Sequence, residues 1–254
     1  MAIYELKCFG TRPGEGNAAL VILDGPAAAD ERQAFAKAAN KSACVFVDGA
    51  TLDYYYPHTR SPLCLHATLA AARVLLADSP GPLTVRTAMR GQELVLTRSE
   101  SGAFVSLAPQ VAPDVAPPAN LAAGLLAAPG LVIASAPRVA SVGSPKLLVE
   151  VADSATLHAL RPDLAAIAHW GKATGVNGIY AWRRRTDCAF EGRNFNHLDP
   201  ALEDSATGVA AGALTVHLGR SLDLYQGAHL GQPCRLRTML DGEKILIGGA
   251  AEYV

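Results

Sequence analysis

Residues 61–76 bring a thiol and an imidazole to the start of a helix. Cys64 and His66 lie just before residues 67–76, which favour a helix and are nearly all Ala, Leu or Val. A helix that is apolar around its whole circumference must be enclosed by the fold, and Pro62 favours a helix start close behind it. Helix starts carry unpaired N–H groups and partial positive charge, which suit a carboxylate or phosphate. The stretch therefore predicts a site at the mouth of a buried helix.

Acidic and hydroxyl side chains come before a second apolar helix near the end of the chain. Residues 208–218 are small and apolar, and Gly219 is placed to end the helix. The polar residues before this helix are Glu203, Asp204, Ser205 and Thr207. Because such residues commonly cap helices, each stretch taken alone can be an ordinary core helix. Finding two such stretches in one chain makes it less favoured that both are only ordinary core helices.

The composition limits the classes of function. The 254 residues carry a formal net charge of -1, which argues against unspecific binding to nucleic acid or to an anionic membrane. The five cysteines are widely spaced and form no CxxC pair, a pattern that favours free thiols in the reducing cytosol. The histidines show no metal-ligand spacing, and no Gly-rich phosphate loop occurs. We expect a cytoplasmic protein without a signal peptide, cofactor or metal, and with no nucleic-acid or membrane partner.

Short strands and a few helices predict an α+β fold of two similar lobes. The helices expected besides the two apolar ones are residues 29–40, 119–126, 154–160 and 162–169. The strands include residues 44–47, 52–56, 131–134 and 244–254. Three prolines in residues 112–119 mark a boundary. We expect an N-terminal lobe of residues 1–112 plus 240–254 around a central helix at 66–77, and a C-terminal lobe of residues 119–239 around one at 207–218.

Several different short motifs follow one another along the chain, from the first predicted strand to the last. They are residues 15–17 (Glu-Gly-Asn), 40–42 (Asn-Lys-Ser), 62–70 (Pro-Leu-Cys-Leu-His-Ala-Thr-Leu-Ala), 193–195 (Arg-Asn-Phe), 203–208 (Glu-Asp-Ser-Ala-Thr-Gly), 225–227 (Tyr-Gln-Gly) and 247–249 (Ile-Gly-Gly). By their order and spacing the chain resembles the PhzF family of phenazine-biosynthesis-like isomerases. These proteins are related in fold to diaminopimelate epimerase and proline racemase.

The resemblance implies a fold and a reaction. Each lobe would wrap a barrel-like mixed sheet around a central helix, and both helix starts would face one cleft. The reaction implied is cofactor-independent proton transfer on a small amino or carboxylic acid, often in a homodimer. His66 and Asp204 match the acid–base residues of the family motifs. The positions expected to bind the substrate are Asn17, Ala43, Leu65, Ala67, Thr207, Gly208 and Val209.

Three of these positions depart from the family pattern. The residue that resembles the family's catalytic glutamate is Ala43, the usual serine after Thr-Gly is Val209, and the usual glycine before the motif histidine is Leu65. A methyl group cannot carry a proton, so the usual chemistry cannot be assumed. The two larger side chains should also make the cleft tighter and more apolar.

Three hypotheses remain open from the sequence. The first is an isomerase that uses Asp204 with His66 in place of the missing glutamate. The second is a racemase or epimerase in which Cys64, activated by the helix start, is one of two acid–base groups. The third is a catalytically silent relative that binds a small acid. Cys44, next to Ala43 on an alternating strand, should point away from the cleft.

Overall fold

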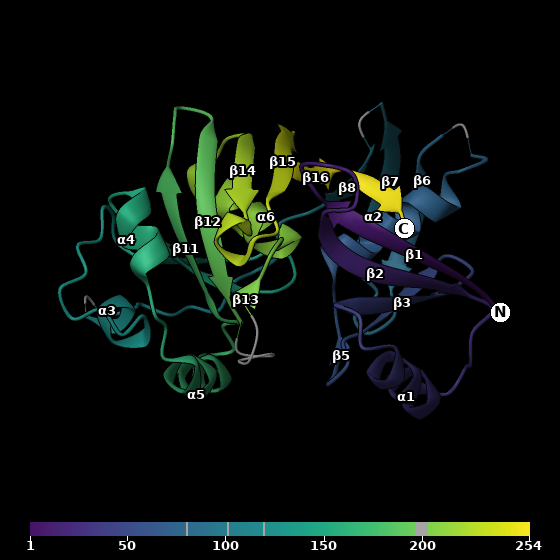
Figure 1. The fold of residues 1–254 in the computed structure, drawn as a ribbon, viewed down its shortest axis with the longest axis horizontal. Coiled ribbons are helices and arrows are strands. Elements are labelled where there is room, and N and C mark those ends of the chain that lie inside the picture. Colours follow the sequence, from purple (N-terminus) through teal and green to yellow (C-terminus); the bar gives the residue numbers. More distant parts are fainter. Residues whose placement is uncertain (80, 101, 119, 197–202) are drawn as a thin grey trace.

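The chain is a mixed α/β fold in which one hydrogen-bonded sheet runs through both halves (Figure 1). The computed structural model describes residues 1–254 except 80, 101, 119 and 197–202. The strands of the first half, together with the end of the chain, pair in the spatial order β17 (Ala251–Tyr253), β1 (Ala2–Phe9), β2 (Gly16–Leu23), β3 (Ala43–Asp48), β4 (Thr51–Tyr55), β6 (Leu83–Thr87), β7 (Glu93–Ser99), β8 (Gly102–Leu107) and β16 (Lys244–Gly249). The short strand β5 (Arg60–Ser61) pairs with β4.

The strands of the second half continue the same ladder from β16. Their spatial order is β15 (Cys234–Asp241), β14 (Leu222–Gln226), β12 (Ala189–Phe195), β11 (Ile179–Arg184), β10 (Lys146–Glu150) and β9 (Arg138–Ala140), with β13 (Glu203–Asp204) beside β12. Strand β16 therefore joins the halves, because it pairs with β8 on one side and β15 on the other.

Two apolar helices lie inside the fold. They are α2 (Leu65–Leu75) and α6 (Gly208–Leu218), and the first eight residues of each are buried. Burial of such a helix on all sides is what its apolar circumference requires, so the prediction of two enclosed helices is confirmed. Gly219 ends α6 in the left-handed conformation, with φ of 61°, where a glycine has no steric penalty.

The remaining helices cover the outside of the strands (Figure 1). They are α1 (Ala29–Ala39), α3 (Leu121–Leu125), α4 (Ser154–Ala159) and α5 (Leu164–Thr174), and a 3-10 turn, η1 (Ala228–Leu230), follows β14. The Asp153 side chain caps α4 by accepting a hydrogen bond from the Thr156 N–H at 2.7 Å, as its position before the helix predicts. The start expected for α3, Ala119, lies outside the described residues.

Two strand predictions differ from the structure. Residues 131–134 form no strand, and only an isolated bridge joins Ile133 to Val151. Residues 244–254 form two strands rather than one, because the chain leaves β15 and β8 at Gly249 and then pairs with β1. Both segments are apolar, and hydrophobicity alone does not tell which partner a strand finds.

No helix among the described residues is long and apolar enough to cross a membrane. The predicted boundary near residues 112–119 falls in a stretch whose described residues carry neither helix nor strand. The division into two lobes with the bounds given above stays a prediction, as does closure of each lobe into a barrel.

Candidate active site

A cavity of about 500 Å³ opens beside the starts of α2 and α6. Its walls come from both halves of the chain: Asn17, Tyr56 and His66 from the first, and Glu203, Asp204 and Ser205 from the second. A concave site with a few converging polar groups is the usual form of a small-molecule site. Three of the predicted site residues (Asn17, His66 and Asp204) thus line one cavity.

Asp204 is held by side chains rather than by the helix behind it. Its Oδ1 accepts a hydrogen bond from Asn17 Nδ2 at 2.5 Å, and its Oδ2 accepts one from Thr207 Oγ1 at 2.6 Å. Gln226 Nε2 donates to the Asp204 carbonyl at 2.6 Å and to Thr207 Oγ1 at 3.0 Å. A carboxylate has about four acceptor sites, so Asp204 keeps accepting capacity for a further proton donor. The alternative that Asp204 is a helix cap is wrong.

Glu203, the neighbouring carboxylate, pairs with an arginine. Arg193 binds it with two hydrogen bonds, Nε to Oε1 at 2.8 Å and Nη2 to Oε2 at 2.6 Å. Such bidentate pairs are among the stronger charge-assisted contacts. The pair fixes β13 on β12. Among the described residues no arginine forms such a pair with Asp204, the second acidic residue of the cavity.

Asn17 ties the two halves together across the cavity floor. It lies on β2, is 4% exposed, and donates from Nδ2 both to Asp204 and, at 2.9 Å, to the carbonyl of Ala206. Its Oδ1 accepts a hydrogen bond from Ser205 Oγ. The whole amide is thereby used within the protein, so Asn17 orients Asp204 more than it offers free donors to a ligand.

The two helix starts meet beside this cavity with their N–H groups uncapped by side chains. Cys64 and Thr207 are the residues before α2 and α6, and neither makes a side-chain capping bond. Gly208 packs directly against Leu65, since a Cβ on Gly208 would lie 2.7 Å from the Leu65 Cβ. Uncapped N–H groups and the helix dipole favour an anion at this place.

Cys64 and His66 form a buried thiol–imidazole pair at the start of α2. Cys64 Sγ lies 3.4 Å from His66 Nδ1, and the two residues are 2% and 6% exposed. Burial alone lowers the pKa of His66, but the neighbouring Cys64 and Asp204 together raise it above its usual value. The ring of His66 therefore holds a proton more readily than a free imidazole does.

The other predicted substrate-binding residues do not line the cavity. Ala43 and Ala67 are fully buried, and Val209 is 9% exposed. Ala43 packs in the core that surrounds α2, whereas Cys44 packs on the opposite side of β3, with Phe46, toward α1. The prediction that Cys44 points away from the cleft is confirmed.

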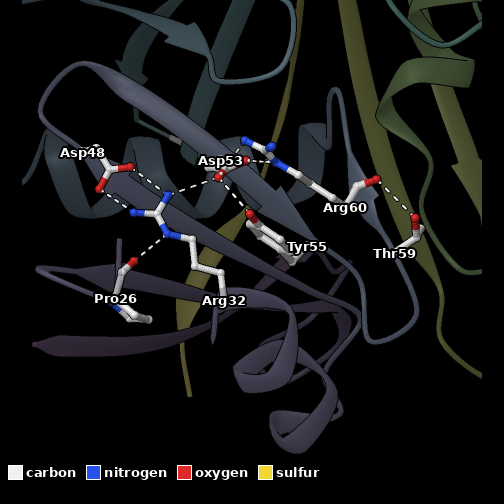
Figure 2. Close-up of polar contacts among 7 residues, drawn as sticks. All are labelled: Pro26, Arg32, Asp48, Asp53, Tyr55, Thr59 and Arg60. Carbon is white, nitrogen blue, oxygen red and sulfur yellow. Dashed lines mark hydrogen bonds and ion pairs between the residues drawn. The ribbon is translucent and has the colours of Figure 1, made fainter. Parts of the chain in front are cut away.

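A buried ion-pair network fixes the turn that forms the opposite wall (Figure 2). Asp53, on β4, accepts hydrogen bonds from Arg60 Nε at 2.8 Å, Arg60 Nη2 at 3.0 Å, Arg32 Nη1 at 3.1 Å and the Tyr55 hydroxyl at 3.1 Å. Arg32 also binds Asp48 at 2.8 Å. Because β4 and β5 flank residues 56–59, these contacts hold the wall of the cavity in place.

Tyr56 is a wall residue that the sequence analysis missed. It lies against Cys64, and burial, with smaller effects of Cys64 and Asp204, raises the pKa of its phenol. The ring stacks on His58, with centroids 5.8 Å apart. The phenol is therefore a neutral hydrogen-bonding group at neutral pH. Nothing in the sequence pattern indicates that this tyrosine faces the cysteine.

Within the described residues no group of three or more His, Cys, Asp or Glu side chains is placed to hold a metal ion. The chemistry that the cavity offers is acid–base chemistry. Its lining includes the Asp204 carboxylate and the His66 imidazole, which contacts the Cys64 thiol, and the two helix starts lie beside it.

The sequence and the fold are similar to those of known proteins. Residues 6–254 match the family described as "Phenazine biosynthesis-like protein" (PhzC-PhzF). An uncharacterized isomerase of Pseudomonas aeruginosa is 32% identical over 263 residues, which cover 99% of this chain and 95% of that protein. Trans-2,3-dihydro-3-hydroxyanthranilate isomerase of the same bacterium is 29% identical over 254 residues, with coverage of 93% and 89%. A protein of that bacterium whose structure is solved, described as a predicted epimerase, has a TM-score of 0.80 at 25% identity, with coverage of 99% of this chain and 96% of that chain.

Proposed function

The chain belongs to the phenazine biosynthesis-like (PhzC-PhzF) family, and on this premise we propose that it is an isomerase of a small carboxylic or amino acid. The isomerase moves a proton within its substrate by acid–base catalysis without a cofactor. The observation that carries the proposal is that Asp204 and His66, from different halves of the chain, line one cavity beside two helix starts.

The proposed reaction has two proton transfers. An oxygen of Asp204 accepts a proton from a C–H bond next to the substrate's carboxylate or carbonyl group, and the electron pair moves into the conjugated system. The partial positive charge of the helix starts stabilises the anion that develops. His66, with its raised pKa, or the protonated Asp204 then donates a proton to a different carbon. The number of protons is unchanged, as an isomerisation requires.

Ala43 excludes one route. The position that resembles the family's catalytic glutamate carries a methyl group that is fully buried. The reaction therefore depends on the groups that the cavity does contain. Of Asp204 and His66, Asp204 is better positioned to act as the base, since Asn17 and Thr207 hold its oxygens in place and fixed groups lose less entropy on reaction.

A racemase or epimerase that uses Cys64 is the second candidate. The 3.4 Å contact between Cys64 Sγ and His66 Nδ1 favours it, because a thiol next to an imidazole can pass its proton to the ring and become a nucleophile or base. The third candidate, a silent relative that binds a small acid, is favoured by Ala43. The predicted homodimer, the cytoplasmic location and the barrel form of each lobe remain part of this proposal.

Hydrogen–deuterium exchange at carbon separates the three candidates. Small amino acids, hydroxy acids and a dihydro-hydroxyanthranilate are incubated with the protein in deuterated water, and incorporation is followed by NMR. An isomerase should exchange at least one of them, Asp204→Asn should reduce the rate at least about a hundredfold, and Cys64→Ser should retain it. Loss on Cys64→Ser supports the racemase instead. A ligand-dependent rise in melting temperature without exchange in any acid contradicts both enzymes and supports the binding protein.

A further inference from the structure

A lysine without a carboxylate in hydrogen-bond contact is buried in the wall behind Asp204. Lys146 begins β10 and is 1% exposed. Among the described residues its hydrogen bond goes from Nζ to the carbonyl of Asn177, at 2.5 Å. Lysine is almost never fully buried without a partner. Its place therefore calls for an explanation beyond packing.

The pairing of strands puts Lys146 on the same face of the sheet as Asp204. Leu148 pairs with Tyr180, Tyr180 pairs with Asn194, and Asn194 pairs with Asp204, so these four side chains share one face. Lys146 lies two residues before Leu148 on β10 and shares that face as well. The core cluster around α6 contains Leu148 and Tyr180, which shows that this face is the inner one.

The amide of Asn194 is unpartnered at the centre of this face. Asn194 is fully buried, and within the described part of the chain neither its Nδ2 nor its Oδ1 has a hydrogen-bond partner. Asn177 Oδ1 is unpartnered too. Buried polar atoms of this kind are commonly satisfied by ordered water. Lys146 and Asn194 are thus buried polar residues on the same sheet face as Asp204.

Asp204 acts electrostatically on groups from five elements or loops around it. Those groups are Tyr56, His66, Lys146, Tyr180 and Cys234. Only the imidazole and the amine among them can carry a positive charge near neutral pH. His66 faces the cavity, whereas Lys146 lies in the wall away from it. The carboxylate therefore has one cation toward the ligand and a second one in the wall behind it.

The charge of this lysine depends on pH in the neutral range. Burial lowers the pKa of Lys146 to about 7, although the Asp204 carboxylate acts to raise it.

We propose that Lys146 is a positioning residue for Asp204: its ammonium group acts on the carboxylate across the inner face of the sheet and helps to keep it directed into the cavity. The inference rests on the proposed role of Asp204 as the base. Lys146 and Asn194 are two buried polar residues of the second half that share this face with Asp204.

The coupling can be measured without any substrate. Lysine labelled at the ε-carbon is titrated by NMR between pH 5 and 10 in the wild type and in Asp204→Asn, and the Lys146 signal is assigned by its loss in Lys146→Met. The titration midpoint of Lys146 should fall by about half a unit or more in Asp204→Asn. Asp223→Asn, which removes a carboxylate on β14 that pairs with Arg235, should leave it unchanged. An unmoved midpoint in Asp204→Asn overturns the proposal.

Two further measurements separate this inference from the proposed function. In a double-mutant cycle of Lys146→Met and Asp204→Asn, the effect of the double replacement on the unfolding equilibrium constant should differ from the product of the two single effects by about a factor of ten. In the exchange assay, Lys146→Met should slow the wild-type rate about tenfold or more and change its dependence on pH. If the wild type exchanges and the effects of the two replacements on stability are additive, the role of Lys146 is contradicted and the proposed function is not. If the effects of the two replacements are not additive but no acid exchanges, the interaction of Lys146 with Asp204 is supported and the proposed enzymatic function is contradicted.

Discussion

Leu65 and Gly208, the first residues of α2 and α6, pack against each other. A Cβ on Gly208 would lie 2.7 Å from the Leu65 Cβ and 3.2 Å from its Cδ1. The tips of the two buried helices therefore touch, and the cavity opens beside the contact, where His66 and Asp204 lie. The expectation that Leu65 makes the cleft tighter stays a prediction, because Leu65 packs against Gly208 and is not among the residues that line the cavity. An anionic ligand would reach the helix starts from the side rather than between them.

Replacing Gly208 by alanine should destabilise the protein. A contact of 2.7 Å is closer than Cβ atoms normally come, so the helix starts must separate, at a cost of about 1–3 kcal/mol in the free energy of unfolding. Chemical denaturation measures this value. Gly124→Ala in α3 is the matched control, because nothing lies within 4 Å of its Cβ position and alanine favours a helix by up to about 1 kcal/mol. Equal stabilisation by both replacements would contradict the contact.

The sequence predicts the two helices better than the groups around them. Helices α2 and α6 were identifiable because they contain almost no polar side chains, and burial is the physical consequence of that composition. The surroundings of Asp204 depend on residues far away in the chain, such as Asn17, which lies 187 positions before it. Such contacts are fixed by strand pairing, and no local pattern encodes them. Lys146 likewise reads as an ordinary strand start until the strand register places it on the same face of the sheet as Asp204.

Removing the charge of Asp53 should destabilise the protein strongly. Asp53 is 3% exposed and lies between Arg32 and Arg60 (Figure 2), so Asp53→Asn leaves the buried Arg32 without part of its compensation. Breaking a buried pair in this way costs about 3–5 kcal/mol. Equilibrium unfolding in guanidinium chloride measures the loss.

The exposed pair of Arg86 and Glu93 provides the control for this measurement. Its partners are 63% and 50% exposed and 3.2 Å apart, and such pairs contribute about 0–1 kcal/mol. Glu93→Gln should therefore change stability little. If Asp53→Asn costs no more than Glu93→Gln, the network does not hold the cavity wall as inferred.

Replacing Asn17 by leucine should cost stability and remove catalysis together. The change takes a hydrogen bond from Asp204 Oδ1 and another from the Ala206 carbonyl, and unsatisfied buried groups cost about 1–3 kcal/mol. Exchange activity should fall because Asp204 loses its fixed orientation. Asn120→Leu is the control, since that side chain makes no capping bond to α3. Full activity in folded Asn17→Leu protein would show that Asp204 needs no such support.

The stability of the protein should rise with pH between about 7 and 10 because of Lys146. The unfolded lysine has a pKa near 10.5, whereas burial lowers the pKa of the folded one to about 7. In that interval the unfolded state binds one more proton than the native state, so each rise in pH favours folding. The contribution approaches about 1.4 kcal/mol per pH unit. Below pH 7 both states bind the proton, and the native state carries the full cost of the buried charge.

Lys146→Met removes this dependence, and comparison with the wild type isolates it from other titrating groups. The stability advantage of the variant over the wild type should shrink steadily as the pH rises from 7 to 9.5, as measured by guanidinium unfolding at each pH. Lys172→Met, on the exposed last turn of α5, serves as the control and should give a curve parallel to that of the wild type. If the curve of Lys146→Met is also parallel to that of the wild type, the buried amine keeps its usual affinity for protons. An ammonium group that stays charged over this pH range while buried would need a charged partner of its own.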